Sequence, residues 1–237
     1  MPARILLALD TPDVETARAH SRSAGDAIDG IKLGLEFFVA NGPGGIAAVR
    51  LDGPPGGRPL FLDLKLHDIP NTVAGAARAA ASLGVSILNV HAQGGAAMMR
   101  AALDAVKSVS PSTKLIAVTM LTSLSDEDLP TVGLTPPVAD QVLRLASLTQ
   151  QAGLDGVVCS PHEITRLRAE LGPDFLLVVP GIRPAGAAVG DQRRVMGPAE
   201  ARDAGADILV IGRPITAAQD PGQAAQEIAQ SLGISDS

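Results

Sequence analysis

Acidic and basic side chains alternate with leucines in one short segment of the sequence. Asp63 and Lys65 are separated by a single leucine, and His67 and Asp68 follow after another. Side chains two residues apart share one face of a β-strand, so Phe61, Asp63 and Lys65 are predicted to lie together. His67 is expected on the same face, and the leucines are expected to pack under helices on the other. Burying a carboxylate and an ammonium costs several kcal/mol each unless they are paired. The pattern therefore favours a functional site, with a structural ion pair as the alternative.

Other charged residues lie at the ends of neighbouring apolar segments. Asp10 closes the first segment, Lys32 lies in the second, and Asp68 follows the third. Two lysines and up to three aspartates are therefore expected around one pocket. A lysine beside carboxylates keeps its proton, because negative charge favours the ammonium form. This favours a proton donor over a Schiff-base nucleophile, which must be neutral. For Asp10 alone, a helix-start signal is the alternative.

Two later segments end in residues suited to binding phosphate. Gly212 and Arg213 follow the last apolar segment, and Pro180 and Arg183 follow the one before it. (β/α)8 barrels frequently bind phosphate with the loops after their last two strands, and arginine can grip phosphate oxygens with two hydrogen bonds. A long glycine-rich stretch between these segments is interpreted as a lid, from which Gln192 reaches the phosphate.

Other polar residues are weaker candidates. The histidines His20, His67, His91 and His162 lack metal-ligand spacing, so no metal site is predicted. His91 ends an apolar segment and is a candidate for lining the pocket. Ser123 either presents its hydroxyl or backbone to a ligand ring or belongs to a turn.

The elements that position these residues follow a βα repeat from end to end. Short apolar segments alternate with alanine-rich stretches of helical period. Strands are predicted at 5–10, 31–36, 60–65, 85–91, 114–121, 156–160, 175–180 and 208–212. Helices are predicted at 14–24, 38–50, 72–83, 96–109, 138–151, 161–171, 198–204 and 222–232. The glycine- and proline-rich stretches 41–45 and 52–57 are interpreted as surface loops.

Eight βα units in 237 residues predict an α/β protein with a single (β/α)8 TIM barrel. An open, doubly wound sheet is the alternative, but it normally has a glycine fingerprint after the first strand. Here residues 9–13 contain no glycine. Since no linker or composition shift marks a boundary, residues 1–237 are expected to form one domain.

Composition limits the partners and the compartment. The net charge of −6, with no Trp, no Tyr and four Phe, disfavours nucleic acid. One cysteine, Cys159, excludes an internal disulfide and fits a reducing cytoplasm. The five apolar residues before Asp10 are too few for a signal-peptide core. No apolar run approaches the roughly 18 residues of a membrane span, so a soluble, cytoplasmic protein is expected.

Together these segments resemble the orotidine 5′-phosphate decarboxylase family, which performs the last step of UMP synthesis. The resemblance runs from residue 7 to about residue 221, and its most specific motif is DLKLHDIPNT at 63–72. Two departures are a longer glycine- and proline-rich stretch before the third strand and Met196 where threonine is common. Supporting matches are Leu9-Asp10, Lys32-Leu33-Gly34, Asn89-Val90-His91-Ala92, Leu121-Thr122-Ser123, Pro180-Gly181-Ile182-Arg183, Gly190-Asp191-Gln192-Arg193 and Ile211-Gly212-Arg213-Pro214-Ile215.

The resemblance implies a decarboxylase that needs no cofactor or metal. Lys65 would donate a proton to C6 of the pyrimidine as carbon dioxide leaves, with Asp63 beside the departing carboxylate. Lys32, Asp63, Lys65 and Asp68 would form a charge network, to which the partner subunit of a homodimer contributes Asp68 and Thr72. The remaining substrate-binding residues would be Asp10 and Lys32 at the ribose, Ser123 and Pro180 at the base, Gln192, Gly212 and Arg213 at the phosphate, and Arg183.

Two other readings of the sequence remain. One is a metal-dependent decarboxylase or aldolase of sugar phosphates on the related D-x-K-x-x-D barrel. The other is a non-catalytic sensor of a phosphorylated ligand that has kept the barrel while its charge network is idle.

Overall fold

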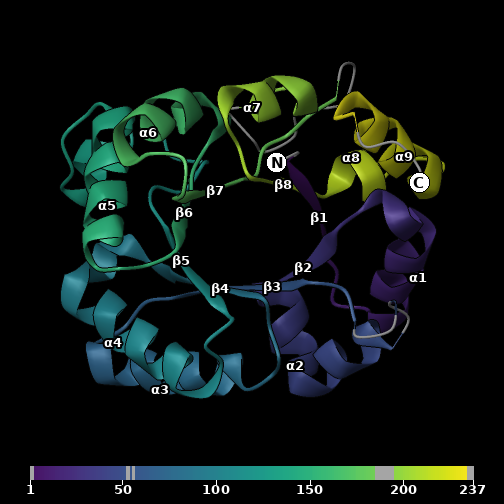
Figure 1. Ribbon diagram of the computed structural model, residues 1–237, viewed down its shortest axis with the longest axis horizontal. Coiled ribbons are helices and arrows are strands. Elements are labelled where there is room, and N and C mark those ends of the chain that lie inside the picture. Colours follow the sequence, from purple (N-terminus) through teal and green to yellow (C-terminus); the bar gives the residue numbers. More distant parts are fainter. Residues whose placement is uncertain (1–2, 52–53, 55–56, 185–194, 234–237) are drawn as a thin grey trace.

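The computed structural model describes residues 3–51, 54, 57–184 and 195–233. Within these residues, eight parallel strands pair in sequence order and close into a barrel, with helices around the ring (Figure 1). The strands are β1 (Arg4–Ala8), β2 (Gly30–Gly34), β3 (Leu60–Leu66), β4 (Ile87–His91), β5 (Lys114–Val118), β6 (Gly156–Val158), β7 (Leu176–Val179) and β8 (Ile208–Ile211).

The predicted (β/α)8 TIM barrel is confirmed, and the open-sheet alternative is wrong. β1 pairs with β8 over four residues, from Arg4 opposite Ile208 to Leu7 opposite Ile211. This pairing closes the ring. An open sheet would instead leave two strands with an unpaired edge.

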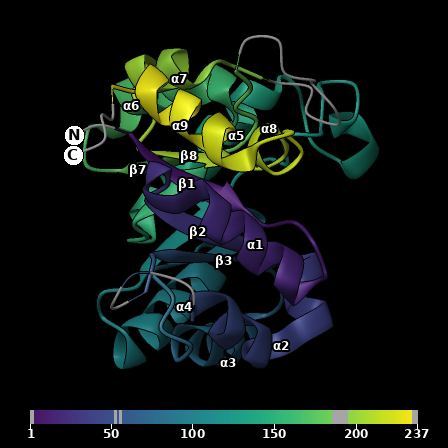
Figure 2. The same ribbon diagram turned by 90° about the vertical axis from the view of Figure 1, so that its right-hand side faces the viewer.

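Helices cover the outside of the barrel. In both views α7 and α9 lie on the opposite side of the ring from α2 and α3 (Figure 2). Of the described helices, none combines the length and apolar character that a membrane span requires. The α-helices are α1 (Val14–Ala24), α2 (Leu35–Arg50), α3 (Pro70–Ala81), α4 (Gly95–Val109), α5 (Val138–Gln151), α6 (Ile164–Leu171), α7 (Pro198–Ala204), α8 (Arg213–Thr216) and α9 (Pro221–Ser231). Short 3-10 helices are η1 (Gly25–Ala27), η2 (Ala92–Gly94), η3 (Leu129–Val132) and η4 (Pro161–Glu163).

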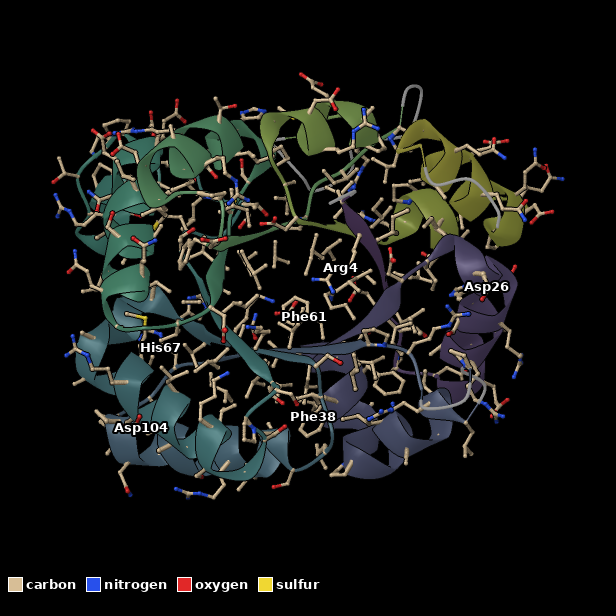
Figure 3. All side chains as sticks on the ribbon, viewed as in Figure 1. Arg4, Asp26, Phe38, Phe61, His67 and Asp104 are labelled. Atoms are coloured by element: carbon tan, nitrogen blue, oxygen red, sulfur yellow. The ribbon has the colours of Figure 1, made fainter. Side chains whose placement is uncertain are left out.

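The strands bury both of their faces, as parallel strands covered by helices must. One set of side chains fills the barrel interior, and the alternating set packs outward against the helices. Phe61 lies inside the ring of strands, whereas Asp26 and Asp104 lie at the periphery (Figure 3). The inward set is Leu6, Ala8, Phe61, Ile87, Ile116, Val178, Ile208 and Val210.

Aspartates secure the amino-terminal ends of several strands. Asp29 accepts a hydrogen bond from the backbone N–H of Ile5 at 2.7 Å, and Asp155 accepts one from Leu115 at 2.8 Å. Asp207 accepts one from the backbone N–H of Leu177 in β7 at 2.7 Å. Each carboxylate lies just before one strand and bonds the start of the preceding one. These three aspartates therefore stabilise the amino-terminal end of the barrel. The carboxyl-terminal end is the one available for a functional site.

Several boundaries differ from the predicted ones. β2 ends at Gly34 because α2 begins at Leu35, and β5 ends at Val118, before the predicted end at residue 121. The stretch 41–45, interpreted as a loop, lies within α2, although Gly42 breaks the helical path with a φ of 58°. Of the other stretch, 52–57, the positions 52–53 and 55–56 lie outside the described residues. The short helix α8 was not predicted.

Candidate active site

A cavity of about 470 Å³ opens at the carboxyl ends of the strands. Its volume lies within the usual range for small-ligand sites. Every strand except β4 and β7 contributes a residue to its lining, and the segment after β7 contributes Pro180, Gly181 and Arg183. It is lined by Ala8, Asp10, Lys32, Phe61, Asp63, Lys65, Val118, Met120, Leu121, Thr122, Val158, Pro180, Gly181, Arg183, Val210, Gly212, Arg213 and Thr216.

The floor of the cavity holds a network of alternating charges. The Lys32 ammonium lies 2.9 Å from Oδ1 of Asp10 and 3.4 Å from Oδ2 of Asp63. The Lys65 ammonium lies 2.6 Å from Oδ1 of Asp63. Lys32 and Asp63 are buried, whereas the Lys65 side chain is 30% exposed. Asp63 therefore contacts two cations, of which Lys65 is the more exposed to the cavity.

Burial and charge act in opposite directions on this network. Burial by itself would lower the pKa of Lys32, but the charges of Asp63 and Asp10 outweigh it and hold that pKa above its usual value. Burial would likewise raise the pKa of Asp63. The charges of Lys32 and Lys65, with hydrogen bonds from Lys65 and Asn89, hold that pKa below its usual range instead. Lys32 and Asp63 therefore stay ionised at neutral pH.

Glycines make room for the network and for a ligand. A Cβ on Gly34 would lie 3.2 Å from Nζ of Lys32 and 3.3 Å from Oδ1 of Asp10, so a side chain there would crowd this ion pair. A Cβ on Gly212 would lie 3.3 Å from Cβ of Ala8. The backbone beside Arg213 therefore comes closer to β1 than a larger residue would comfortably allow.

One edge of the cavity is basic. Arg213 begins α8, and Arg183 follows β7. Burial and the positive charge of Arg213 both lower the pKa of Arg183. Two guanidinium groups that influence each other in this way create a positive potential at this edge, which suits an anionic group.

The third strand departs from the alternation predicted for it. Leu62 pairs with Leu88 but Leu66 pairs with Val90, so the regular register is lost between them. Lys65 has a φ of 52°. The expectation that His67 continues the inward face is wrong, because β3 ends at Leu66 and His67 is exposed beyond it. The His67 ring lies instead 5.4 Å from that of His91.

Not every predicted site residue faces this cavity. Asp68, Thr72 and Ser123 are exposed and lie outside the lining. The carboxylate of Asp68 accepts a 2.6 Å hydrogen bond from the backbone N–H of Ile69. Gln192 lies outside the described residues.

The sequence analysis missed several residues that the fold brings to the site. Thr122 lines the cavity in place of its neighbour Ser123, and Thr216 lines it from α8. Asn89 lies behind the network and donates a 2.7 Å hydrogen bond to Asp63. A polar residue inside the apolar strand ILNVH was a signal for Asn89. Among the described residues, no group of three or more His, Cys, Asp or Glu side chains is arranged to hold a metal ion.

A parallel barrel with a charged cavity at the carboxyl ends of its strands defines an enzyme of the TIM-barrel class. The comparisons give the particular family. The orotidine 5′-phosphate decarboxylase / HUMPS family matches residues 3–228, and the chain belongs to this family. The resemblance seen in the sequence is thus confirmed.

Individual relatives agree over nearly the whole chain. An orotidine 5′-phosphate decarboxylase from Paramagnetospirillum magneticum is 51% identical, with 97% of this chain and 98% of that protein covered. Another from Anaeromyxobacter sp. (strain K) is 53% identical, with 97% and 98% covered. A crystal structure of orotidine 5′-phosphate decarboxylase from Lactobacillus acidophilus has a TM-score of 0.85 at 39% identity and covers 98% of this chain and 99% of that one.

Proposed function

We propose that this chain decarboxylates orotidine 5′-phosphate to UMP in pyrimidine biosynthesis. The observation that carries the proposal is the network of Lys32, Asp63 and Lys65 in the cavity floor, on a chain 51–53% identical to relatives named for this activity. A sensor of a phosphorylated ligand would not need a buried carboxylate held between two ammonium groups, because such charges are costly to desolvate.

The proposed chemistry uses the network as a fixed electrostatic environment. The bond between C6 of the pyrimidine and its carboxylate breaks, carbon dioxide leaves, and the electron pair stays on C6. Lys65 transfers a proton from its ammonium to C6 and later regains one from solvent. Because the carbanion has no electron sink in the ring, preorganised positive charge must stabilise it. Asp63 anchors Lys65 at 2.6 Å and lies beside the departing carboxylate.

The rest of the substrate is assigned to the walls of the cavity. Arg213 and Gly212 take the phosphate at the basic edge, with Arg183 nearby. Asp10 and Lys32, which form a 2.9 Å ion pair with each other, are assigned to the ribose. Pro180 contacts the base. Ser123 is also assigned to the base, and Gln192 is assigned to the phosphate.

We further propose a homodimer in which each site is completed by the partner subunit. Asp68 and Thr72 belong to the family motif but do not face the cavity of their own chain. Ile69, between them, is 66% exposed, which is unusual for a large apolar residue and supports burial against a second copy. In the dimer, Asp68 would extend the network of the partner subunit.

We also propose a single domain, no nucleic-acid partner and a cytoplasmic location. The closed barrel supports the treatment of residues 1–237 as one domain. The net charge of −6 supports the absence of a nucleic-acid partner. The single cysteine, which permits no internal disulfide, supports a cytoplasmic location.

A metal-dependent reaction on a sugar phosphate is the alternative, because Asp63, Lys65 and Asp68 also fit a D-x-K-x-x-D motif. The geometry favours the cofactor-free reaction. The Lys32 ammonium already lies 3.4 Å from Asp63, where it would repel a cation bound by that carboxylate. The chelator EDTA should therefore leave turnover unchanged.

The decisive experiment is an assay of the purified chain with orotidine 5′-phosphate, followed by loss of its ultraviolet absorbance. We expect conversion to UMP, with and without chelator. An inactive, folded chain would overturn the proposal. Turnover of orotidine 5′-phosphate that a chelator abolishes and magnesium restores would contradict the cofactor-free reaction.

A further inference from the structure

A fully buried amide connects the side chain of Asp63 to the backbone of Lys65 from behind β3. Asn89 lies in β4, does not line the cavity, and has no exposed surface. Its Nδ2 donates a 2.7 Å hydrogen bond to Oδ1 of Asp63. Its Oδ1 accepts a 2.8 Å hydrogen bond from the backbone N–H of Lys65. A carboxylate accepts and a backbone N–H donates, so these two partners fix the orientation of the amide.

The backbone of β3 is irregular next to this amide. Leu62 of β3 pairs with Leu88 of β4, and Leu66 pairs with Val90. Three residues of β3, 63–65, therefore lie opposite one residue of β4, Asn89. Lys65 has a φ of 52°, in the left-handed region that a lysine adopts only at an energetic cost. A strained segment keeps one conformation only when its surroundings determine it. Asn89 bonds both ends of this segment.

We propose that Asn89 is the positioning residue for the proton donor. Its amide holds the irregular segment of β3 so that the Lys65 ammonium and the Asp63 carboxylate stay in one arrangement at the cavity floor. The inference rests on the proposed function, in which Lys65 supplies the proton. Asparagine suits the position because one short side chain must both donate to a carboxylate and accept from an N–H.

Two substitutions separate this role from simple packing. Asn89→Leu keeps the branching at Cγ, with bulkier methyl groups, but removes both hydrogen bonds. Asn89→Asp keeps the acceptor for Lys65 but places a second carboxylate beside Asp63. Thr149→Val is the matched control, because it removes the hydroxyl of an equally buried residue in α5, which donates to the carbonyl of Leu145 and to the sulfur of Met99.

The expected kinetic result is a loss in kcat with little change in binding. A misplacement of about 1 Å costs about 100-fold, so Asn89→Leu should lower kcat by about tenfold to 100-fold. Binding of UMP, measured by calorimetry, should stay within about twofold, because the basic edge of the cavity is untouched. Thr149→Val should keep the wild-type kcat.

The pH profile gives a readout that packing would not change. At neutral pH, Asn89→Asp should also be impaired. As the pH falls, the introduced carboxyl and Asp63 share one proton, which restores both the donor and the net charge of the wild type. The activity of Asn89→Asp relative to the wild type should therefore rise with acidity, and that of Asn89→Leu should not.

These outcomes decide the inference. If Asn89→Leu keeps kcat within twofold of the wild type, or if Asn89→Asp follows the wild-type pH profile, Asn89 does not position the donor. Should Asn89→Leu fail to fold, the nearly isosteric Asn89→Asp still decides through its pH profile. An inactive wild type would instead overturn the proposed function itself.

Discussion

The ammonium of Lys65 lies 2.6 Å from Oδ1 of Asp63, two residues earlier in the same strand. Asp63 is buried and also contacts Lys32, whereas the Lys65 side chain is partly exposed to the cavity. The pair thus joins a fixed buried charge to a cation that a ligand can reach. This arrangement makes Lys65 the first residue to test.

Lys65→Ala should abolish decarboxylation while the barrel stays folded. The substitution removes the proton source, and loss of a general acid typically costs about 10²–10⁴-fold. Turnover and thermal unfolding should be measured together. Lys114→Ala is a suitable control, because Lys114 pairs with Asp155 at the start of β5, at the other end of the barrel. A folded Lys65→Ala variant with more than a tenth of the wild-type kcat would contradict the assignment.

Arg213→Ala should weaken the use of substrate rather than stop the chemistry. Hydrogen bonds to charged groups contribute about 1.5–3 kcal/mol, so kcat/KM should fall by about tenfold to 150-fold. Added guanidinium should restore part of this loss. Arg166→Ala, which breaks an exposed ion pair with Asp140, should have no effect. If Arg213→Ala matches the wild type at low substrate concentration, the phosphate site has been misplaced.

The proposed sharing of sites can be tested with mixed dimers. Lys65→Ala and Asp68→Ala homodimers should each be nearly inactive, because every site in them carries one lesion. A mixed dimer should contain one site with both lesions and one with neither. Refolding equal amounts together should give about half mixed dimers, and so about a quarter of wild-type activity, in a two-fold symmetric assembly.

A tagged pull-down should confirm that the mixed dimers have formed. Recovery near a quarter supports a partner's Asp68 in each site. Confirmed mixed dimers without recovered activity would mean that Asp68 acts within its own chain.

Stability should depend on pH through the buried network. The pKa of Asp63 is held below its usual range, so its contribution is present above the usual carboxyl pKa and is lost as the pH falls through the lowered value. The unfolding free energy of the wild type relative to Asp63→Asn should therefore be greatest near neutral pH and should shrink in acid. Urea unfolding from about pH 7 to about pH 3 measures this. A difference that stays constant over this range would contradict the ionised network.

Lys32 should act at the opposite end of the pH scale. Its pKa is held above the usual lysine value, so its stabilising contribution is present below that usual value and is lost as the pH rises through the raised one. The unfolding free energy relative to Lys32→Met should thus fall only under strongly alkaline conditions. An equal loss near neutral pH would contradict this prediction.

Local sequence patterns determined much of this protein. The spacing of apolar residues is enough to predict the eight βα units, because each strand and helix buries a face whose period is local. Asp63 and Lys65 share the cavity as their alternation predicted. The positions of Gly212 and Arg213 at the end of β8 followed from the order of the strands.

The tertiary structure decided which side chains actually meet. Asn89 and Asp63 are 26 residues apart, and only the pairing of β3 with β4 places the amide against the carboxylate. Ser123 and Thr122 are equivalent in a sequence pattern, but the path of the loop turns Thr122 to the cavity. Closure of the ring likewise depends on the register of β1 against β8. Registers and loop paths are set by packing between distant segments, which no local period of the sequence encodes.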